Sequence, residues 1–89
     1  MSKTPTLEEK RHMGRVQQLG CIVCAGPASV HHAGTGAGGR RDHMKVLPLC
    51  YYHHQGEQGI HTLGRKRWGA VYGTEDELLA KVDAALGMP

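Results

Sequence analysis

The sequence predicts a small α+β domain that is stabilised by a metal ion. With 89 residues, the chain is long enough for one domain over residues 1–89 and too short for a second hydrophobic core. It contains no Phe, one Trp and 13 Gly, so it has little apolar surface to offset the entropy lost on ordering the backbone. Domains of this kind usually need a disulfide, a structural metal or a partner. One helix signal is followed by two strand signals and then by two further helix signals, and this segregated order gives the α+β class.

A capping signal predicts the first helix. We expect residues 1–5 to be a disordered terminus, and Thr6 with Glu9 fits the T-x-x-E capping box. A basic helix over residues 7–19 is therefore predicted, and Gly20 is expected to end it. Its thin apolar stripe is expected to consist of Leu7, Val16 and Leu19.

Two short strands are expected in the middle of the chain. Residues 29–32 form one strand, and residues 44–48 form the other, which the proline at its end should terminate. The Gly-rich residues 33–42 lie between them and favour no regular element. The two strands are therefore expected to pair as a hairpin with a long connecting loop.

Further helical structure is predicted after the strands. One segment begins near residues 49–51, carries several histidines, is made irregular by two glycines and ends before residues 63–64. The C-terminal helix has the clearest signal, because Thr74 with Glu77 forms a second capping box and Gly87 supplies a stop. Its apolar positions are Leu78, Leu79, Val82 and Leu86.

Four aromatic residues could either pack in the core or stack on nucleic-acid bases. Trp68 and Tyr72 are four residues apart, which is a helical spacing, and we expect them in the core. Tyr51 and Tyr52 could stack on bases, but in a helix beside a metal site we expect core positions for them too.

The cysteines fall into two short pairs that suit a tetrahedral zinc site. Cys21 with Cys24 forms a C-x2-C pair, and Cys50 with His53 forms a C-x2-H pair. Each pair lets two ligands point at one ion, as structural zinc requires. The alternative is three free cysteines that act as small hydrophobic residues, beside a surface histidine. Because all three cysteines of the chain lie in these pairs, we predict structural Zn²⁺.

Six further histidines remain, and four of them lie close in sequence to the predicted strand and to the second zinc-type pair, where one zinc ion cannot bind them all. His31 and His32 are adjacent in the first strand, and His54 and His61 follow the zinc-type pairs. Adjacent strand residues point to opposite faces, so one of the pair is expected at a hydrolytic centre and the other beside it. Each histidine alone could simply be hydrogen-bonded or exposed, but four in this arrangement favour a second site.

The charge balance is compatible with nucleic acid as a partner. The net charge is +3 and the calculated pI is about 8.9. The cations group on both sides of the histidine-rich region, although solvated surface charge is the alternative. The candidate DNA-binding residues are Arg40, Arg41, Lys45, Arg65, Lys66 and Arg67.

The absence of a signal peptide and of an apolar segment of transmembrane length leads us to expect a cytoplasmic protein with no membrane partner. The odd number of cysteines also argues against a disulfide framework.

The motifs VHH, LPLCYYHH and a following histidine resemble those of the HNH, or ββα-metal, nucleases. More narrowly, the chain resembles the phage recombination-enhancement family of recombinase-dependent nucleases in CIVC, VHHAGTGAGGRRDHMKVLPLCYYHH, GIHTLG and WGAVYGTEDELL. The resemblance covers about Lys10 to Val82. It implies a zinc-stabilised ββα-metal (HNH) core with flanking N- and C-terminal helices, and a phage or prophage nuclease acting in a bacterial host cell.

The resemblance also implies a role for each remaining histidine. His32 would be the general base, and His31, His54 and His61 would hold a catalytic divalent ion, which could be Mg²⁺, Mn²⁺, Ni²⁺ or Zn²⁺. One position departs from the family pattern, because Lys45 stands where the HNH asparagine is expected. Either Asp42 or a backbone carbonyl then orients His32, or Lys45 contacts phosphate instead.

These features together predict a metal-dependent DNA endonuclease with low sequence specificity. The resemblance implies that it could act on DNA in a recombinase filament or in a recombination intermediate. The alternative is a non-catalytic zinc-binding module that binds nucleic acid. The adjacent pair His31 and His32 favours the nuclease, because a purely structural zinc module gives no reason for it.

Overall fold

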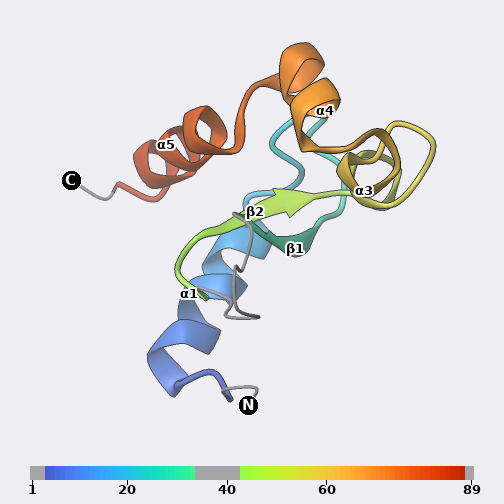
Figure 1. Cartoon of the computed structure of the whole chain (residues 1–89). Coiled ribbons are helices and arrows are strands. Elements are labelled where there is room, and N and C mark those ends of the chain that lie inside the picture. Colours follow the sequence, from blue (N-terminus) through green and yellow to red (C-terminus); the bar gives the residue numbers. More distant parts are fainter. Residues whose placement is uncertain (1–3, 34–42, 88–89) are drawn as a thin grey trace.

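A two-stranded antiparallel sheet lies at the centre of the fold, and helices pack around it (Figure 1). The computed structural model describes residues 4–33 and 43–87. In chain order, the elements are α1 (Leu7–Gln18), β1 (Ser29–His32), β2 (Val46–Leu49), α2 (Tyr51–His54), α3 (Ile60–Leu63), α4 (Arg65–Tyr72) and α5 (Glu75–Ala85). The predicted α+β class is confirmed.

The two strands pair as the predicted hairpin, with Ser29 opposite Leu49 and His32 opposite Val46. The prediction that Pro48 ends the second strand is wrong, since β2 continues through it to Leu49. The Pro48 carbonyl accepts a hydrogen bond from the Ile22 N–H at 2.9 Å, on the side away from β1. In an antiparallel strand the N and O of one residue face the same side, so no ladder bond needs a Pro48 N–H.

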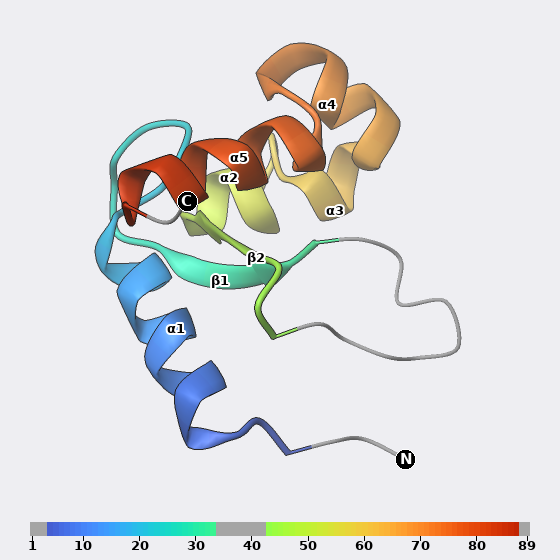
Figure 2. The same cartoon turned by 90° about the vertical axis from the view of Figure 1, so that its left-hand side faces the viewer.

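Helices cover both faces of the sheet, with α1 on one side and α5 on the other (Figure 2). All four residues of β2 are buried, because successive side chains point alternately toward the two helices. The predicted core position of Trp68 is confirmed, with none of its surface exposed. The buried hydrophobic residues are Val16, Cys21, Val46, Leu47, Leu49, Ile60, Trp68, Leu78 and Val82.

Helix α1 begins with the predicted capping box, in which Thr6 and Glu9 exchange side chain to backbone hydrogen bonds. Its predicted apolar stripe is largely wrong, because Leu7 is 63% exposed and Leu19 is 37% exposed. A helix of 12 residues is about 18 Å long, whereas a four-residue strand spans about 13 Å, so the ends of α1 extend past the sheet. The buried side chains are His12 and Val16, one turn apart.

The predicted irregular helix with the histidines is two short helices, α2 and α3. The chain between them returns tightly, because a Cβ on Gly59 would lie 2.6 Å from the His54 carbonyl oxygen. Only glycine permits this approach. The segment was predicted to end before Leu63, but α3 includes this residue and ends at it. The expected core positions of Tyr51 and Tyr52 are wrong, since they are 74% and 49% exposed on the outer side of α2.

Helix α5 has the second predicted capping box, between Thr74 and Glu77. Leu78 and Val82 are buried in the core, while Leu79 and Leu86 pack against its edge. The longest helix of the described part of the chain is α1, with 12 residues. Within residues 4–33 and 43–87, no helix combines the length and the apolar character that crossing a membrane would require.

Candidate metal centres

The fold gathers cysteine and histidine side chains into two separate clusters. In each cluster, one ligand atom per residue lies within 4.8 Å of every other. We call the first the cysteine cluster, and its members are Cys21, Cys24, Cys50 and His53. We call the second the histidine cluster, and its members are His31, His54 and His61. These groupings agree with the two ligand sets predicted from the sequence.

Local backbone structure presents the cysteine cluster. The Cys21 N–H donates to the Gly26 carbonyl and the Ala25 N–H donates to the Cys21 carbonyl, both at 2.8 Å, which closes a tight turn around the first pair. Cys50 is the N-cap residue of α2, and His53 lies in that helix. The second pair is therefore held on a single helical turn beside the first.

The distances in the cysteine cluster fit a tetrahedral zinc ion. With Zn–S bonds near 2.3 Å, two thiolates of a tetrahedron lie about 3.8 Å apart. The Cys24 and Cys50 sulfur atoms are 3.7 Å apart. The His53 Nδ1 lies 3.1 Å from the Cys50 sulfur and 3.9 Å from the Cys21 sulfur. These four residues could hold zinc without a large rearrangement.

The surroundings of Cys21 favour its thiolate form. Burial alone would raise the pKa of this thiol, but hydrogen bonds from backbone groups at Cys50 and Cys24 outweigh it. The net result is a pKa below the usual value for cysteine. A thiol that ionises readily suits a metal ligand, since the thiolate is the form that binds.

The histidine cluster draws its members from three elements, β1, α2 and α3. The His54 Nε2 lies 3.3 Å from the His31 Nδ1 and 3.0 Å from the His61 Nε2. With metal–nitrogen bonds near 2.1 Å, two imidazole nitrogens lie about 3.0 Å apart at a right angle and about 3.4 Å apart in a tetrahedron. The cluster therefore fits a divalent ion that keeps further coordination positions open.

The surroundings of His31 and His54 favour the neutral form of both imidazoles. Burial lowers the pKa of His54 to about 4, with the charges of His31 and His61 as smaller causes. Burial also lowers the pKa of His31, although the hydrogen bond to Glu75 opposes this. Because a metal binds only the neutral ring, both shifts favour metal binding at neutral pH.

His32 is not a member of the histidine cluster, and it contacts a residue that was not predicted from the sequence. Its Nε2 lies 2.9 Å from the Nδ1 of His43, which is buried next to the start of β2. From the sequence, Asp42 or a backbone carbonyl was expected as the partner, and Asp42 lies outside the described residues. Lys45, at the position of the HNH asparagine, is exposed. The only available signal was that His43 is one more histidine near the second strand.

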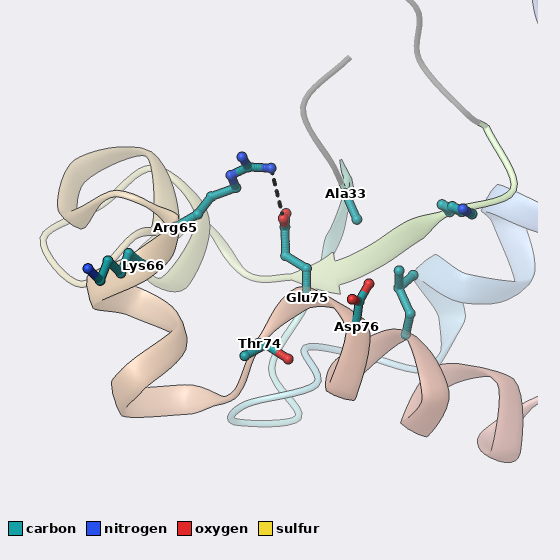
Figure 3. A pocket seen from close by; sticks show the side chains of 8 residues that line it. Ala33, Arg65, Lys66, Thr74, Glu75 and Asp76 are labelled. Atoms are coloured by element: carbon teal, nitrogen blue, oxygen red, sulfur yellow. Dashed lines mark hydrogen bonds and ion pairs between the residues drawn. The ribbon is translucent and has the colours of Figure 1, made fainter. Parts of the chain in front are cut away.

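Glu75 is the second residue that the sequence reasoning missed. Its Oε2 lies 2.9 Å from the His31 Nε2, and its Oε1 accepts a hydrogen bond from the Arg65 Nη1 at 3.3 Å (Figure 3). Glu75 is the first residue of α5, and the sequence presented it only as an acid in the first turn of a capped helix. Its contact with His31, 44 residues away, has no local signature.

A hollow of about 330 Å³ adjoins the histidine cluster, and both strand histidines line it. Its lining residues are Val30, His31, His32, His54, Gln55 and His61. A second hollow, of about 490 Å³, lies on the far side of Glu75. Lys45, Arg65 and Lys66 contribute to its wall (Figure 3). Histidine side chains therefore dominate the first hollow, and basic side chains lie beside the second.

The predicted DNA-binding residues are only partly described. Arg40 and Arg41 lie outside the described residues. Lys45 and Lys66 are exposed, as is Arg67. Arg65 is 46% exposed but also pairs with Glu75, so it has a structural contact as well as a free face.

The chain belongs to the recombination enhancement, RecA-dependent nuclease family, whose model matches residues 5–86. The match covers every helix and strand described above. It agrees with the narrower of the two resemblances noted in the sequence. The family name describes a nuclease that depends on RecA.

Proposed function

We propose that this protein is a metal-dependent DNA endonuclease that hydrolyses phosphodiester bonds with low sequence specificity. The observation that carries the proposal is a single hollow lined by three converging imidazoles and by His32. A separate cysteine cluster with zinc-like distances leaves these histidines free for chemistry. Membership of a family described as nucleases supports the same conclusion.

The catalytic unit is a ββα-metal (HNH) core made of β1, β2 and α2. The cysteine cluster would bind Zn²⁺ and fix α2 against the turn that follows α1. Adjacent residues of α2 then serve different clusters, since His53 belongs to the cysteine cluster and His54 to the histidine cluster. Successive helix residues point about 100° apart, which makes this division possible.

His31, His54 and His61 would hold the catalytic divalent ion. When bound, such an ion supplies positive charge to a phosphate oxygen and to the leaving 3′ oxygen. Three imidazole ligands suit Mn²⁺, Ni²⁺ or Zn²⁺ better than Mg²⁺, which prefers oxygen. The open side of the cluster faces the hollow of about 330 Å³, where the phosphate would sit.

His32 would act as the general base, and His43 would orient it. If the proton of a neutral His32 sits on Nε2 and this N–H donates a hydrogen bond to the His43 Nδ1, the lone pair of the His32 ring is on Nδ1. That atom could take the proton from an attacking water. His43 then replaces the base-orienting group that is missing at Lys45.

The DNA strand would be held by charge rather than by base-specific contacts. Lys45, Arg65 and Lys66 border the second hollow, close to the histidine cluster. Arg40, Arg41 and Arg67 would add phosphate contacts. Binding through phosphates alone carries no sequence information, which accounts for the low specificity we expect.

We further propose that cutting takes place on DNA bound in a RecA filament, as the family name suggests. A catalytic domain of this size has few substrate contacts of its own. Recruitment to a filament would raise the local concentration of DNA at the active site.

The test is a comparison of wild type with His32→Ala on supercoiled plasmid and single-stranded circles. Reactions contain Mg²⁺, Mn²⁺ or Ni²⁺, with and without a RecA filament. We expect nicking by wild type and a loss of about 10²- to 10⁴-fold in the variant, the range typical for a general base. Zinc content and circular dichroism should be unchanged. Equal inactivity of two folded, zinc-loaded proteins under all conditions would instead favour a non-catalytic zinc-binding module.

A further inference from the structure

His31 makes a different contact with each nitrogen of its ring. Its Nδ1 faces His54 within the histidine cluster, at 3.3 Å from that residue's Nε2. Its Nε2 lies 2.9 Å from the Glu75 carboxylate on the other side. An ionised carboxylate only accepts hydrogen bonds, so the proton of a neutral His31 must sit on Nε2. The lone pair is then on Nδ1, the atom directed at the cluster.

Glu75 is itself held in place from two directions. Its side chain is 13% exposed, and Arg65 donates a hydrogen bond to the carboxylate oxygen that His31 does not use. Its backbone begins α5 directly after Thr74, the residue that caps this helix (Figure 3). The carboxylate therefore has little freedom to leave the His31 ring.

We propose that Glu75 is a positioning residue for the metal centre, holding His31 in the tautomer that offers Nδ1 to a divalent cation. The inference rests on the proposed function, because it gives the histidine cluster a metal. Histidine ligands generally donate their second ring N–H to a carboxylate, carbonyl or water, and this outer contact orients the ring and raises its basicity. Glu75 contacts the far nitrogen, so it lies outside the converging ligand atoms.

This arrangement makes α5 part of the metal centre. Leu78 and Val82 fix the helix in the core, one and two turns beyond Glu75. Arg65, at the start of α4, completes a chain of contacts from the wall of the second hollow to the metal ligand. A C-terminal helix that looks like a cover for the sheet therefore has a direct role in ligand geometry.

The experiment compares wild type with Glu75→Ala, Glu75→Gln and the control Asp76→Ala. Asp76 is the exposed neighbour of Glu75 in the same helical turn, and its replacement by Ala removes the same charge as Glu75→Ala. Mn²⁺ alone is titrated into zinc-loaded protein without DNA and followed by electron paramagnetic resonance. In parallel, ¹⁵N chemical shifts report the His31 tautomer before Mn²⁺ is added.

We expect Glu75→Ala to weaken Mn²⁺ binding by about 10- to 100-fold, the usual cost of losing such a contact. Glu75→Gln should weaken Mn²⁺ binding less than Glu75→Ala does, because the amide oxygen can accept the same hydrogen bond from His31. Asp76→Ala should match wild type. The His31 signal should be that of an Nε2–H ring in wild type and a tautomer mixture in Glu75→Ala, with zinc content constant.

Two results would overturn the inference. The first would reject only the role of Glu75, and the second would also reject the proposed nuclease. Wild-type Mn²⁺ affinity in Glu75→Ala, or an unchanged His31 tautomer, would remove Glu75 from the metal centre and leave the proposed nuclease intact. Wild type that binds no Mn²⁺ and cuts no DNA with any divalent ion would reject both proposals together.

Discussion

The two clusters of the molecule use similar side chains but differ in how they are built. The cysteine cluster has four ligands, which come from two pairs with two residues between their members. The histidine cluster has three ligands from three elements and opens onto a hollow. Structural zinc sites are closed by four protein ligands, whereas catalytic sites keep a position for water or substrate.

Under the proposed function, this difference would assign stability and chemistry to separate groups within one small domain. The cysteine cluster joins the turn after α1 to the start of α2, and therefore ties distant parts of the chain together. The histidine cluster depends on that framework, because its ligands converge only when β1, α2 and α3 are correctly packed. Loss of the first should abolish the second, but not the reverse.

The largest effect is expected when a residue of the cysteine cluster is replaced. Cys50→Ser should lose zinc and unfold, because apparent zinc-binding free energies of roughly 10–16 kcal/mol match or exceed the roughly 5–15 kcal/mol net stability of a domain. His61→Ala should keep one zinc and its fold while losing nuclease activity. Both variants are compared with wild type by their zinc content and by thermal unfolding followed by circular dichroism. A folded, zinc-free Cys50→Ser protein would contradict the division of roles.

An intermediate effect, on the rate of nicking, is expected when the contact between His43 and His32 is removed. His43→Ala should reduce the rate of nicking by about tenfold, because it removes one hydrogen bond worth roughly 0.5–1.5 kcal/mol to the orientation of His32. Single-turnover rates with plasmid give the comparison, and Met44→Ala is the neighbouring control, because that side chain is exposed. A full loss of Mn²⁺ binding in His43→Ala would place this residue in the metal centre instead.

The smallest expected effect concerns the pH dependence of stability. The folded protein holds the pKa of His54 at about 4, whereas an unfolded chain has about 6.5, so the unfolded state takes up the proton first as pH falls. The stability that His54 contributes is complete above about pH 6.5 and is lost progressively toward about pH 4.

The matched variant is His54→Gln, which cannot take up this proton. The difference in unfolding free energy between wild type and His54→Gln should shrink as the pH is lowered from about 7.5 to about 5.5. Urea unfolding of zinc-loaded protein without other divalent ions measures it, and the subtraction removes the shared pH dependence of the cysteine cluster. A difference that stays constant over this range would mean that the ring is not shielded as described.

Much of the fold could be predicted because its signals are local. Both capping boxes and both cysteine-containing pairs act within three or four residues, and they stand where the sequence indicated. Most of the wrong predictions concern burial. Leu7 and Tyr51 were expected to pack inward, but burial depends on where a neighbouring element ends, which no local pattern records.

The sequence by itself determined which side chains could bind metal, since cysteine and histidine at these spacings have few other uses in so small a core. Only the tertiary structure decided which groups contact the histidines of the candidate site. His43 reaches His32 through the hairpin, and Glu75 reaches His31 across 44 residues through the packing of α5. Such contacts depend on strand register and helix docking, which arise from the burial of the whole core rather than from the residues at the site.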